Sequence, residues 1–393
     1  MNLTAIQIPE EQRENRSLLS YLDFDPLLFV AAFGLVGCSL VTLHGAAGTH
    51  YVERQAAYAG IGVLLALVIS RFDYSRLREY RYGFYALMIA SNLLVYAMPV
   101  QPGENAQRWI PLPFIQVQPS EFGKILMILT LAGVVVERSR NLHERRTMTR
   151  VMLLALLGAM IVIGQPDLGT GMVYLVVAVS VLFFAGIGWK QLTALAALFV
   201  TAGVLVLAVA PALHVNVLKG YQKERLTTFI DPPRVCESSD TTCYQLNQSL
   251  IAIGSGQKTG RGVSGATQTK FKFIPEAQDD FIFAVVGETY GFVGAALVLS
   301  LYALLIWRTL RILTMAKNLF GTLIAAGVLA MIMFQVFLNV GMTIGIMPVT
   351  GVPLPLLSYG GSSVLVTFIS IGLLQSIYAQ GRAASAGKAR VVL

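Results

Sequence analysis

The sequence predicts an all-α polytopic membrane protein with about ten transmembrane helices. Hydrophobic residues make up 55% of the 393 residues and charged residues only 13%, and the mean hydropathy is +0.66. A soluble globular domain carries about twice that share of charged residues. The apolar residues also fall into blocks of about 17 to 25, the length of helix that crosses a bilayer. The alternating pattern of a membrane β-barrel is absent, so helices are expected to satisfy the backbone.

The apolar blocks give the boundaries of the expected spans. These are 26–43, 56–71, 83–100, 119–136, 151–164, 171–187, 192–211, 281–306, 319–340 and 361–378. The residues before the first span are polar, and they lack the apolar region and the small-residue cleavage site of a signal peptide. We therefore expect the first span itself to direct insertion into the membrane.

Lysine and arginine gather in every second loop of this arrangement. By the positive-inside rule, those loops and both termini are expected in the cytoplasm. The basic clusters that follow the second, fourth and eighth spans are Arg71, Arg76, Arg78 and Arg81, then Arg138, Arg140, Arg145, Arg146 and Arg150, then Arg308, Arg311 and Lys317. The net charge of +8 is thus explained by membrane topology, and no nucleic-acid partner is expected.

We expect a single transmembrane domain over residues 1–393, with a large extracytoplasmic loop at 212–280 between the seventh and eighth spans. A loop of this length in a compact bundle is more often functional than idle. It contains Cys236 and Cys243, which on the oxidising side of the membrane could form a disulfide or stay as free thiols. Cys38 lies inside an apolar span, where a small hydrophobic role is expected.

The segment Gln118–Lys124 (QPSEFGK) opens the fourth span. Proline in the first turn, a carboxylate near the positive helix end and Lys124 three residues after Glu121 all fit ordinary helix initiation. That interpretation does not explain Arg108 and Trp109, which precede the segment on the same outer face. An Arg108 beside Glu121 and Lys124 would complete a buried polar cluster, and ionisable groups at membrane depth indicate function. Both interpretations stay open.

Two glycine-containing motifs favour structural interpretations. In Gln165–Gly171 (QPDLGTG), Asp167 is expected to cap a helix and the glycines to allow close packing. The segment Gly254–Gly260 (GSGQKTG) differs from a phosphate-binding loop, because the Gly-Lys-Ser/Thr order and a preceding strand are absent.

Polar residues and irregular backbone also occur near the outer ends of the last spans. Ser358–Ser363 (SYGGSS) follows three prolines, and irregular backbone near membrane depth indicates that it packs on protein or lines a watery cavity. Asn339 and Glu288 are further polar residues within spans, and Asn339 is expected to form an interhelical hydrogen bond.

Asp279 and Asp280 stand where the long loop runs into the eighth span. From position alone, Asp280 is either the N-cap of that helix or a functional carboxylate. Neighbouring carboxylates titrate as a coupled pair, which suits a general base but also arises in a pair without function.

Taken together, these stretches resemble the SEDS family (shape, elongation, division and sporulation), whose members are polytopic peptidoglycan polymerases. The motifs that carry the resemblance are, in order, Arg108-Trp109, QPSEFGK at 118–124, QPDLGTG at 165–171, YQKER at 221–225, YQLNQSLIAIGSG at 244–256, FIPEAQDDFIFAVVGE at 273–288 and, after Asn339, MPVTGVPLPLLSYGGSS at 347–363. The segment Gly265–Lys270 is more similar to RodA members than to FtsW members.

The resemblance implies a peptidoglycan glycosyltransferase that polymerises lipid II at the outer face of the bacterial cytoplasmic membrane, with undecaprenyl pyrophosphate as the leaving group. The RodA-like segment implies a role in cell-wall elongation and cell shape. The family pattern P-E-x-x-x-D-F falls on residues 275–281 and gives Asp280 the catalytic role. Gln278 and Asp279 replace the usual His-Thr of the family.

Glycosyl transfer from a diphosphate needs a base for the attacking hydroxyl and positive charge for the departing pyrophosphate. The candidate substrate-binding residues are Arg108, Trp109, Gln118, Ser120, Glu121, Lys124, Arg225, Lys270, Glu276 and Ser358. No cofactor is predicted. A divalent cation could share the pyrophosphate charge, although the sequence has no ligand cluster with recognisable spacing.

Three other functions fit parts of the pattern. A lipid II flippase would use the same polar cavity to move the headgroup, and an FtsW-like division polymerase is the alternative within the family. A scaffold for a penicillin-binding protein explains the apolar spans but leaves the polar residues without purpose. The resemblance itself implies a class B penicillin-binding protein as partner, which would supply transpeptidation.

Overall fold

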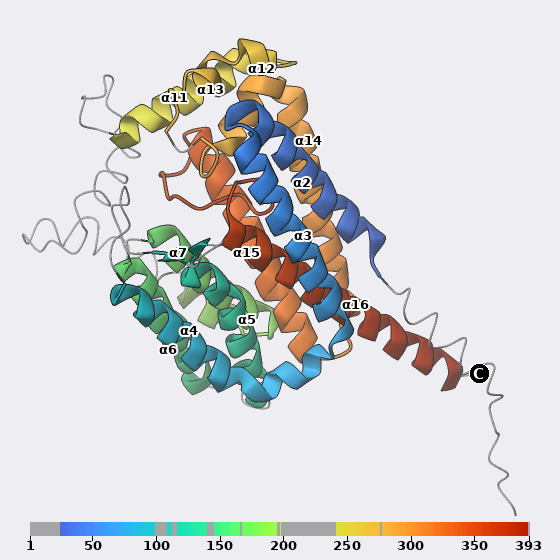
Figure 1. Ribbon diagram of the computed structural model, residues 1–393. Helices are drawn as coiled ribbons and strands as arrows, with labels where there is room; N and C mark the ends of the chain where they lie inside the picture. The colour runs from blue at the N-terminus through green and yellow to red at the C-terminus, as the bar shows by residue number, and fades with distance from the viewer. Residues whose placement is uncertain are drawn as a thin grey trace, which may run out of the picture.

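The computed structural model describes residues 24–98, 108–111, 116–139, 145–165, 167–194, 197, 241–275 and 277–391. Within these ranges the chain forms a bundle of long helices with a group of shorter helices at one end (Figure 1). The bundle helices are α2 (Pro26–Ala46), α3 (Thr49–Arg71), α4 (Arg81–Tyr96), α5 (Pro119–Glu137), α6 (Arg145–Gly164), α7 (Leu168–Phe184), α14 (Ile282–Met315), α15 (Leu319–Thr343) and α16 (Gly361–Val391). The other elements are η1 (Tyr74–Tyr80), β1 (Ile110–Pro111), β2 (Gln116–Val117), α11 (Thr241–Gly256), α12 (Gly262–Gly265) and α13 (Thr267–Lys270).

The bundle confirms the predicted all-α membrane fold. Seven of the described helices are long and apolar enough to cross a membrane, and α7 is a shorter apolar helix. Every predicted span coincides with a helix except 192–211, most of which lies outside the described residues. The last span continues to Val391 instead of ending at 378, and the eighth span continues to Met315 instead of ending at 306. Arg308 is tolerated inside this helix because its Nε donates a hydrogen bond to Asp25 at 2.8 Å.

Helix starts follow local sequence signals. The side chain of Asp25 accepts hydrogen bonds from the amides of Leu27 (3.1 Å) and Leu28 (3.2 Å), and so caps α2. Asp167 and Asn318 cap α7 and α15 in the same way. Proline occupies the first turn of both α2 and α5, where its missing amide hydrogen costs nothing.

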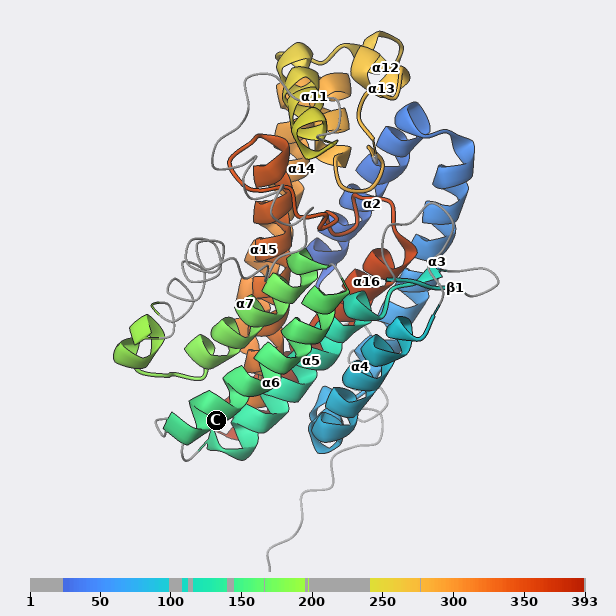
Figure 2. The same cartoon turned by 90° about the vertical axis from the view of Figure 1, so that its left-hand side faces the viewer.

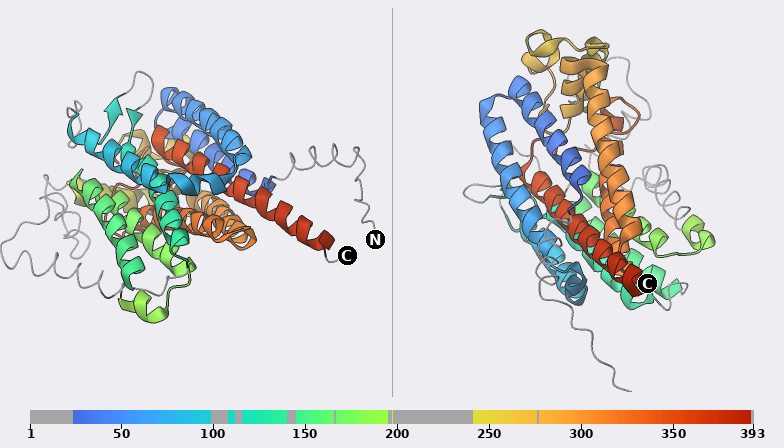
Figure 3. Two further views of the ribbon diagram at one scale, coloured as in Figure 1. Left: turned by 90° about the horizontal axis from the view of Figure 1, so that it is seen from below. Right: turned by 90° about the vertical axis from the view of Figure 1, so that its right-hand side faces the viewer.

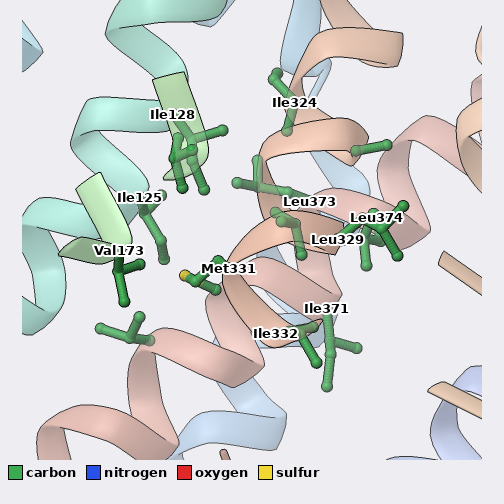
Figure 4. Close-up of a cluster of buried hydrophobic side chains, with 14 of the residues drawn as sticks. Ile125, Ile128, Val173, Ile324, Leu329, Met331, Ile332, Ile371, Leu373 and Leu374 are labelled. Carbon is green, nitrogen blue, oxygen red and sulfur yellow. The ribbon is translucent and has the colours of Figure 1, made fainter. Parts of the chain in front are cut away.

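Helices α5, α15 and α16 form the centre of the bundle. In their apolar windows 83%, 72% and 89% of the residues are buried, against 28% to 44% in α2, α3, α6 and α14. Helix α3 lies along α16, α14 packs against both α2 and α15, and α5 packs against α4 and α7 (Figures 2 and 3). Ile125, Val173, Met331 and Leu373 are among the side chains that fill the space between these helices (Figure 4). The less buried helices therefore face lipid.

The shorter helices α11, α12 and α13 lie over the first part of α14 (Figure 1). Helix α14 is interrupted at Gly291, where φ is 64° and ψ is −157°. The neighbouring glycine-rich segment supplies a backbone partner at the break, because the Phe292 amide donates to the Gln257 carbonyl at 2.9 Å. A Cβ atom at Gly260 would come within 2.2 Å of the Thr289 carbonyl oxygen. The segment Gly254–Gly260 therefore packs directly against the backbone of α14, and its glycines allow this close approach.

The cysteines separate into two environments. Cys243 at the start of α11 is disulfide-bonded, and its predicted partner Cys236 lies outside the described residues. Cys38 within α2 is a free, partly buried thiol, as its apolar surroundings predict.

Candidate active site

The turn that carries Asp279 and Asp280 ends just before α14, and both side chains are half-buried. Asn339 of α15 is fully buried, and its Nδ2 donates hydrogen bonds to the carbonyl oxygens of Asp280 (2.8 Å) and Val352 (2.7 Å). The sequence predicts an interhelical hydrogen bond for Asn339. The structure shows instead that Asn339 binds two loops. The consequence is that the backbone of Asp280 is fixed to the bundle.

The interpretation of Asp280 as a helix cap is wrong. The cap position of α14 belongs to Phe281, and no side chain caps the first turn there. The local preference of aspartate for N-caps is overridden because Asn339 holds the Asp280 carbonyl. The carboxylate of Asp280 therefore does not cap α14.

Asp279 lies in a polar region formed with Tyr359 and Arg54. The pKa of Tyr359 lies above its ordinary value, mainly because the side chain is partly buried. A hydrogen bond from Arg54 lowers this pKa, whereas the nearby Tyr58 and Asp279 raise it. The Tyr359 amide also donates to the carbonyl of Gln278 at 2.9 Å. These contacts place the loop before α16 directly against the turn that carries the two aspartates.

The first turn of α5 contains a buried ion pair between Glu121 and Lys124. Their side chains are 3% and 0% exposed, and the Lys124 ammonium donates to the Glu121 carboxylate. Pro119 lies in the first turn, as helix initiation predicts, but initiation does not require either charge to leave water.

Asp167 joins the starts of α5 and α7. It is 5% exposed, and its Oδ1 caps α7 by accepting from the Thr170 amide at 3.1 Å, which confirms the structural interpretation of this motif. Its Oδ2 accepts from Ser120 Oγ (3.1 Å) and from Gln118 Nε2 (3.2 Å). The carboxylate thus also organises two candidate substrate-binding residues, a role that no local sequence signal indicates.

The polar residues at the start of α5, here called the α5 cluster, are Gln118, Ser120, Glu121 and Lys124. The loop between α15 and α16 connects this cluster to the Asp280 turn. Just after the loop, in the first turn of α16, Ser362 Oγ accepts from the Gln118 amide at 2.9 Å. In the middle, Val352 lies against Gly169, where a Cβ atom would come within 2.2 Å of Val352 Cγ2. The carbonyl of Val352 accepts from Asn339, which also binds Asp280. The loop and the first turn of α16, residues 345–362, therefore connect the start of α5 to the Asp280 turn.

Ser358 has a structural partner for each of its polar groups. It is 1% exposed, its Oγ accepts from the Leu354 amide at 2.9 Å, and its carbonyl accepts from Gln55 Nε2 at 3.0 Å. Gln55 is fully buried and also accepts from the Gly360 amide at 3.3 Å. Sequence reasoning does not single out Gln55, although an amide just before an apolar span is a usable signal.

The remaining candidates are more dispersed. Arg108 and Trp109 are half-buried and precede the β1–β2 hairpin, whose register pairs Ile110 with Val117 and so continues toward Trp109 and Gln118. Lys270 is exposed at the end of α13. Arg225 and Glu276 lie outside the described residues. Among the residues that the structure does describe, no group of three or more His, Cys, Asp or Glu side chains could hold a metal ion.

An apolar groove lies next to the α5 cluster. It has a volume of about 510 Å³ and runs between α3, α4, α5 and α16. Val117 and Pro119 line one end beside Gln118, and Tyr74 and Leu77 line the other. Phe72 and Leu87 in its wall are strongly exposed, so the groove opens toward lipid.

Comparisons with known proteins agree with this arrangement. A model of the FtsW, RodA and SpoVE family, described as cell cycle protein, matches residues 20–383. Stage V sporulation protein E of Bacillus subtilis is 34% identical over 329 residues, which are 83% of this chain and 86% of that protein. Peptidoglycan glycosyltransferase MrdB of Escherichia coli is 34% identical over 357 residues, which are 90% of this chain and 93% of that protein.

The fold is also similar to a chain in a solved peptidoglycan synthase complex, in a study of the coordination of polymerization and crosslinking. The TM-score is 0.76 at 30% sequence identity, with 92% of this chain and 99% of that chain covered. The family match covers most of the chain, and the motif resemblance points to the same group. The chain belongs to the FtsW, RodA and SpoVE family of bacterial cytoplasmic-membrane proteins.

Proposed function

We propose that this chain polymerises lipid II into glycan strands at the outer face of the cytoplasmic membrane. It is a peptidoglycan glycosyltransferase of its family, as the relative named MrdB is. The observation that carries the finer proposal is the segment 345–362, which joins the Asp280 turn to Gln118 at the start of α5. A general base and a cationic group are thereby held at the same end of the bundle.

In the proposed reaction, Asp280 takes the proton of the 4-hydroxyl of the acceptor GlcNAc. The oxygen attacks the anomeric carbon of the donor MurNAc, the bond to pyrophosphate breaks, and the α-linked donor becomes a β-1,4-linked unit with inversion. Lys124, with Glu121 as its orienting partner, stabilises the negative charge on the departing undecaprenyl pyrophosphate. Arg108, Arg225 and Lys270 are further candidates for this contact.

The apolar groove supports a lipid-linked substrate. A polyprenyl chain needs an apolar surface that continues into the bilayer, while its pyrophosphate stays at the polar end. The groove meets both needs, because Val117 and Pro119 at one end adjoin Gln118 and the exposed Phe72 and Leu87 face lipid. A polyprenyl chain in this groove would bring the pyrophosphate next to the start of α5.

The arrangement of the ends supports the proposed orientation. The start of α2 and the last turns of α16 lie at the same end of the bundle, and α11, α12 and α13 lie at the other (Figures 1 and 3). With both termini in the cytoplasm, residues 212–280 and Asp280 are extracytoplasmic. We further propose a role in elongation, based on the RodA-like segment Gly265–Lys270, and a class B penicillin-binding protein as partner, which the relative in a synthase complex supports.

The test is chain formation from labelled lipid II by the purified protein with its partner transpeptidase present and absent, and with chelator added in parallel. Asp280→Asn should lower the rate by about 100- to 10,000-fold, because it removes the general base. Asp279→Asn is the matched control and should have a smaller effect. Near-normal polymer from a well-folded Asp280→Asn variant would refute the proposal. Transport of lipid II across vesicles without polymer would favour a flippase instead.

A further inference from the structure

Glu288 is a buried carboxylate that the proposed reaction does not use. It lies on α14, about two turns after Asp280, and is 0% exposed. Its Oε1 accepts from the Gln268 amide at 2.8 Å, and its Oε2 accepts from the amide and the hydroxyl of Thr269 at 2.9 and 2.7 Å. All three donors belong to the short helix α13. Because an isolated carboxylate is costly to bury, these bonds account for its presence in the interior.

The bonds to Glu288 close a short loop. The chain leaves α13 after Lys270, passes through the turn with Asp280, and enters α14 at Ile282. Since Thr269 is held against α14 by Glu288, this connection begins and ends on the same helix. A short closed loop has far fewer conformations than one with a free end. The bonds of Glu288 therefore hold the beginning of the connection that leads to Asp280.

A second clamp acts on the same loop from the opposite side. Asn339 holds the carbonyl of Asp280, and the Tyr359 amide holds the carbonyl of Gln278. These bonds fix the end of the loop near α14, whereas Glu288 fixes its beginning. Neither clamp alone determines the path of the whole connection.

We propose that Glu288 is a positioning residue for Asp280, which it holds in place by fixing α13 to α14. The proposal rests on the proposed function only where it concerns activity. Glutamine at position 288 keeps the size of the side chain but replaces one acceptor oxygen with a donor, which faces donors in α13. The beginning of the loop is then released while the helix itself is retained.

The first test is kinetic. Glu288→Gln should lower kcat of polymerisation by up to about 100-fold, because a displacement of about 1 Å in a catalytic group has that effect, and should leave KM for lipid II nearly unchanged. Thr269→Val removes only one of the three bonds and should have a smaller effect. In an Asp280→Asn background, Glu288→Gln should cause little further loss, because the group it positions is already gone. Multiplied losses in the double variant would overturn the proposal and indicate general destabilisation.

The second test does not depend on activity. Lys270 and Lys272 are exposed next to the residues of α13 that bind Glu288. Cleavage by trypsin at these lysines therefore reports whether α13 stays bound to α14. Cleavage there should be faster in Glu288→Gln than in the unchanged protein. Gln268→Ala is the matched control, because it keeps the backbone amide that binds Glu288, and its cleavage should be unchanged. Unchanged cleavage in Glu288→Gln would refute the proposal that Glu288 holds α13 against α14, whatever the rate of polymerisation by this variant. A fully active Asp280→Asn variant would instead refute the proposed function and leave the docking result standing.

Discussion

Two buried ion pairs in this bundle are built in different ways. Asp25 and Arg308 join α2 to α14, and the backbone of Asp25 is bonded in both directions to Gln375 of α16, at 2.8 and 2.9 Å. Glu121 and Lys124 lie on one helix, α5, three positions apart. The first pair lies near Gln375 and the second near the start of α16, on the order of 20 Å away along that helix.

The comparison separates a structural pair from a functional candidate. Burying two charges costs several kcal/mol per ion, so a buried pair needs a further explanation. Asp25 and Arg308 have one, since Asp25 caps α2, its carboxylate binds Arg308 of α14, and its backbone binds Gln375 of α16. Glu121 and Lys124 bind only each other among the described residues, and a pair within a helix contributes about 0.2–0.5 kcal/mol. Their burial is therefore better explained by chemistry than by stability.

The largest effect on stability is expected for Arg308→Met. It leaves the carboxylate of Asp25 buried without its cation and should lower the free energy of unfolding by about 3–5 kcal/mol. Unfolding by SDS titration from detergent micelles would measure the change. Arg311→Met on the same helix is the matched control, because Arg311 is exposed. Equal stability of the two variants would show that Asp25 and Arg308 do not hold the bundle.

The double replacement Glu121→Gln with Lys124→Met tests the other pair. Removal of both charges avoids leaving one of them unpaired, so stability should be unchanged or higher. Polymerisation of lipid II should nevertheless fall by about 100- to 1,000-fold, the usual effect of losing one group that stabilises developing charge. If most activity remains, the pair only begins a helix and the contrast with Asp25 and Arg308 fails.

An intermediate effect is expected for Asn339→Leu. The substitution leaves the carbonyls of Asp280 and Val352 without their donor, which should cost about 1–3 kcal/mol of stability. Because the Asp280 turn loses its backbone clamp, the rate of polymerisation should fall more than the folded fraction does. If activity falls only as much as the folded fraction does, Asn339 contributes to stability alone, as Arg308 does.

The sequence predicts those parts of this fold that depend on local patterns. Apolar blocks locate the helices, and Asp167 is recognised as a cap because aspartate, proline and glycine stand at typical positions. Contacts between distant segments have no such signal. Asp25 and Arg308 are 283 positions apart, and the hydropathy pattern treats Arg308 as the end of a span. The interpretation of Asp280 as a cap fails for the same reason, since the sequence does not show that Asn339, 59 positions away, binds the Asp280 carbonyl.

The smallest effect is expected for a third, exposed pair. Asp73 has a side chain that is 43% exposed, and its Oδ1 lies 3.7 Å from Lys317 Nζ. Partial burial raises the pKa of Asp73, but hydrogen bonds from Ser75 and the charge of Lys317 outweigh it, so the pKa is below its ordinary value. The charged pair therefore contributes stability above the ordinary pKa of aspartate and loses it as pH falls through the lowered pKa of the folded state. Asp73→Asn, which keeps the oxygen that accepts from Ser75, should cost less than about 1 kcal/mol at pH 7. The difference in thermal midpoint should vanish in acid, and a cost that persists there would mean that Asp73 acts through shape rather than charge.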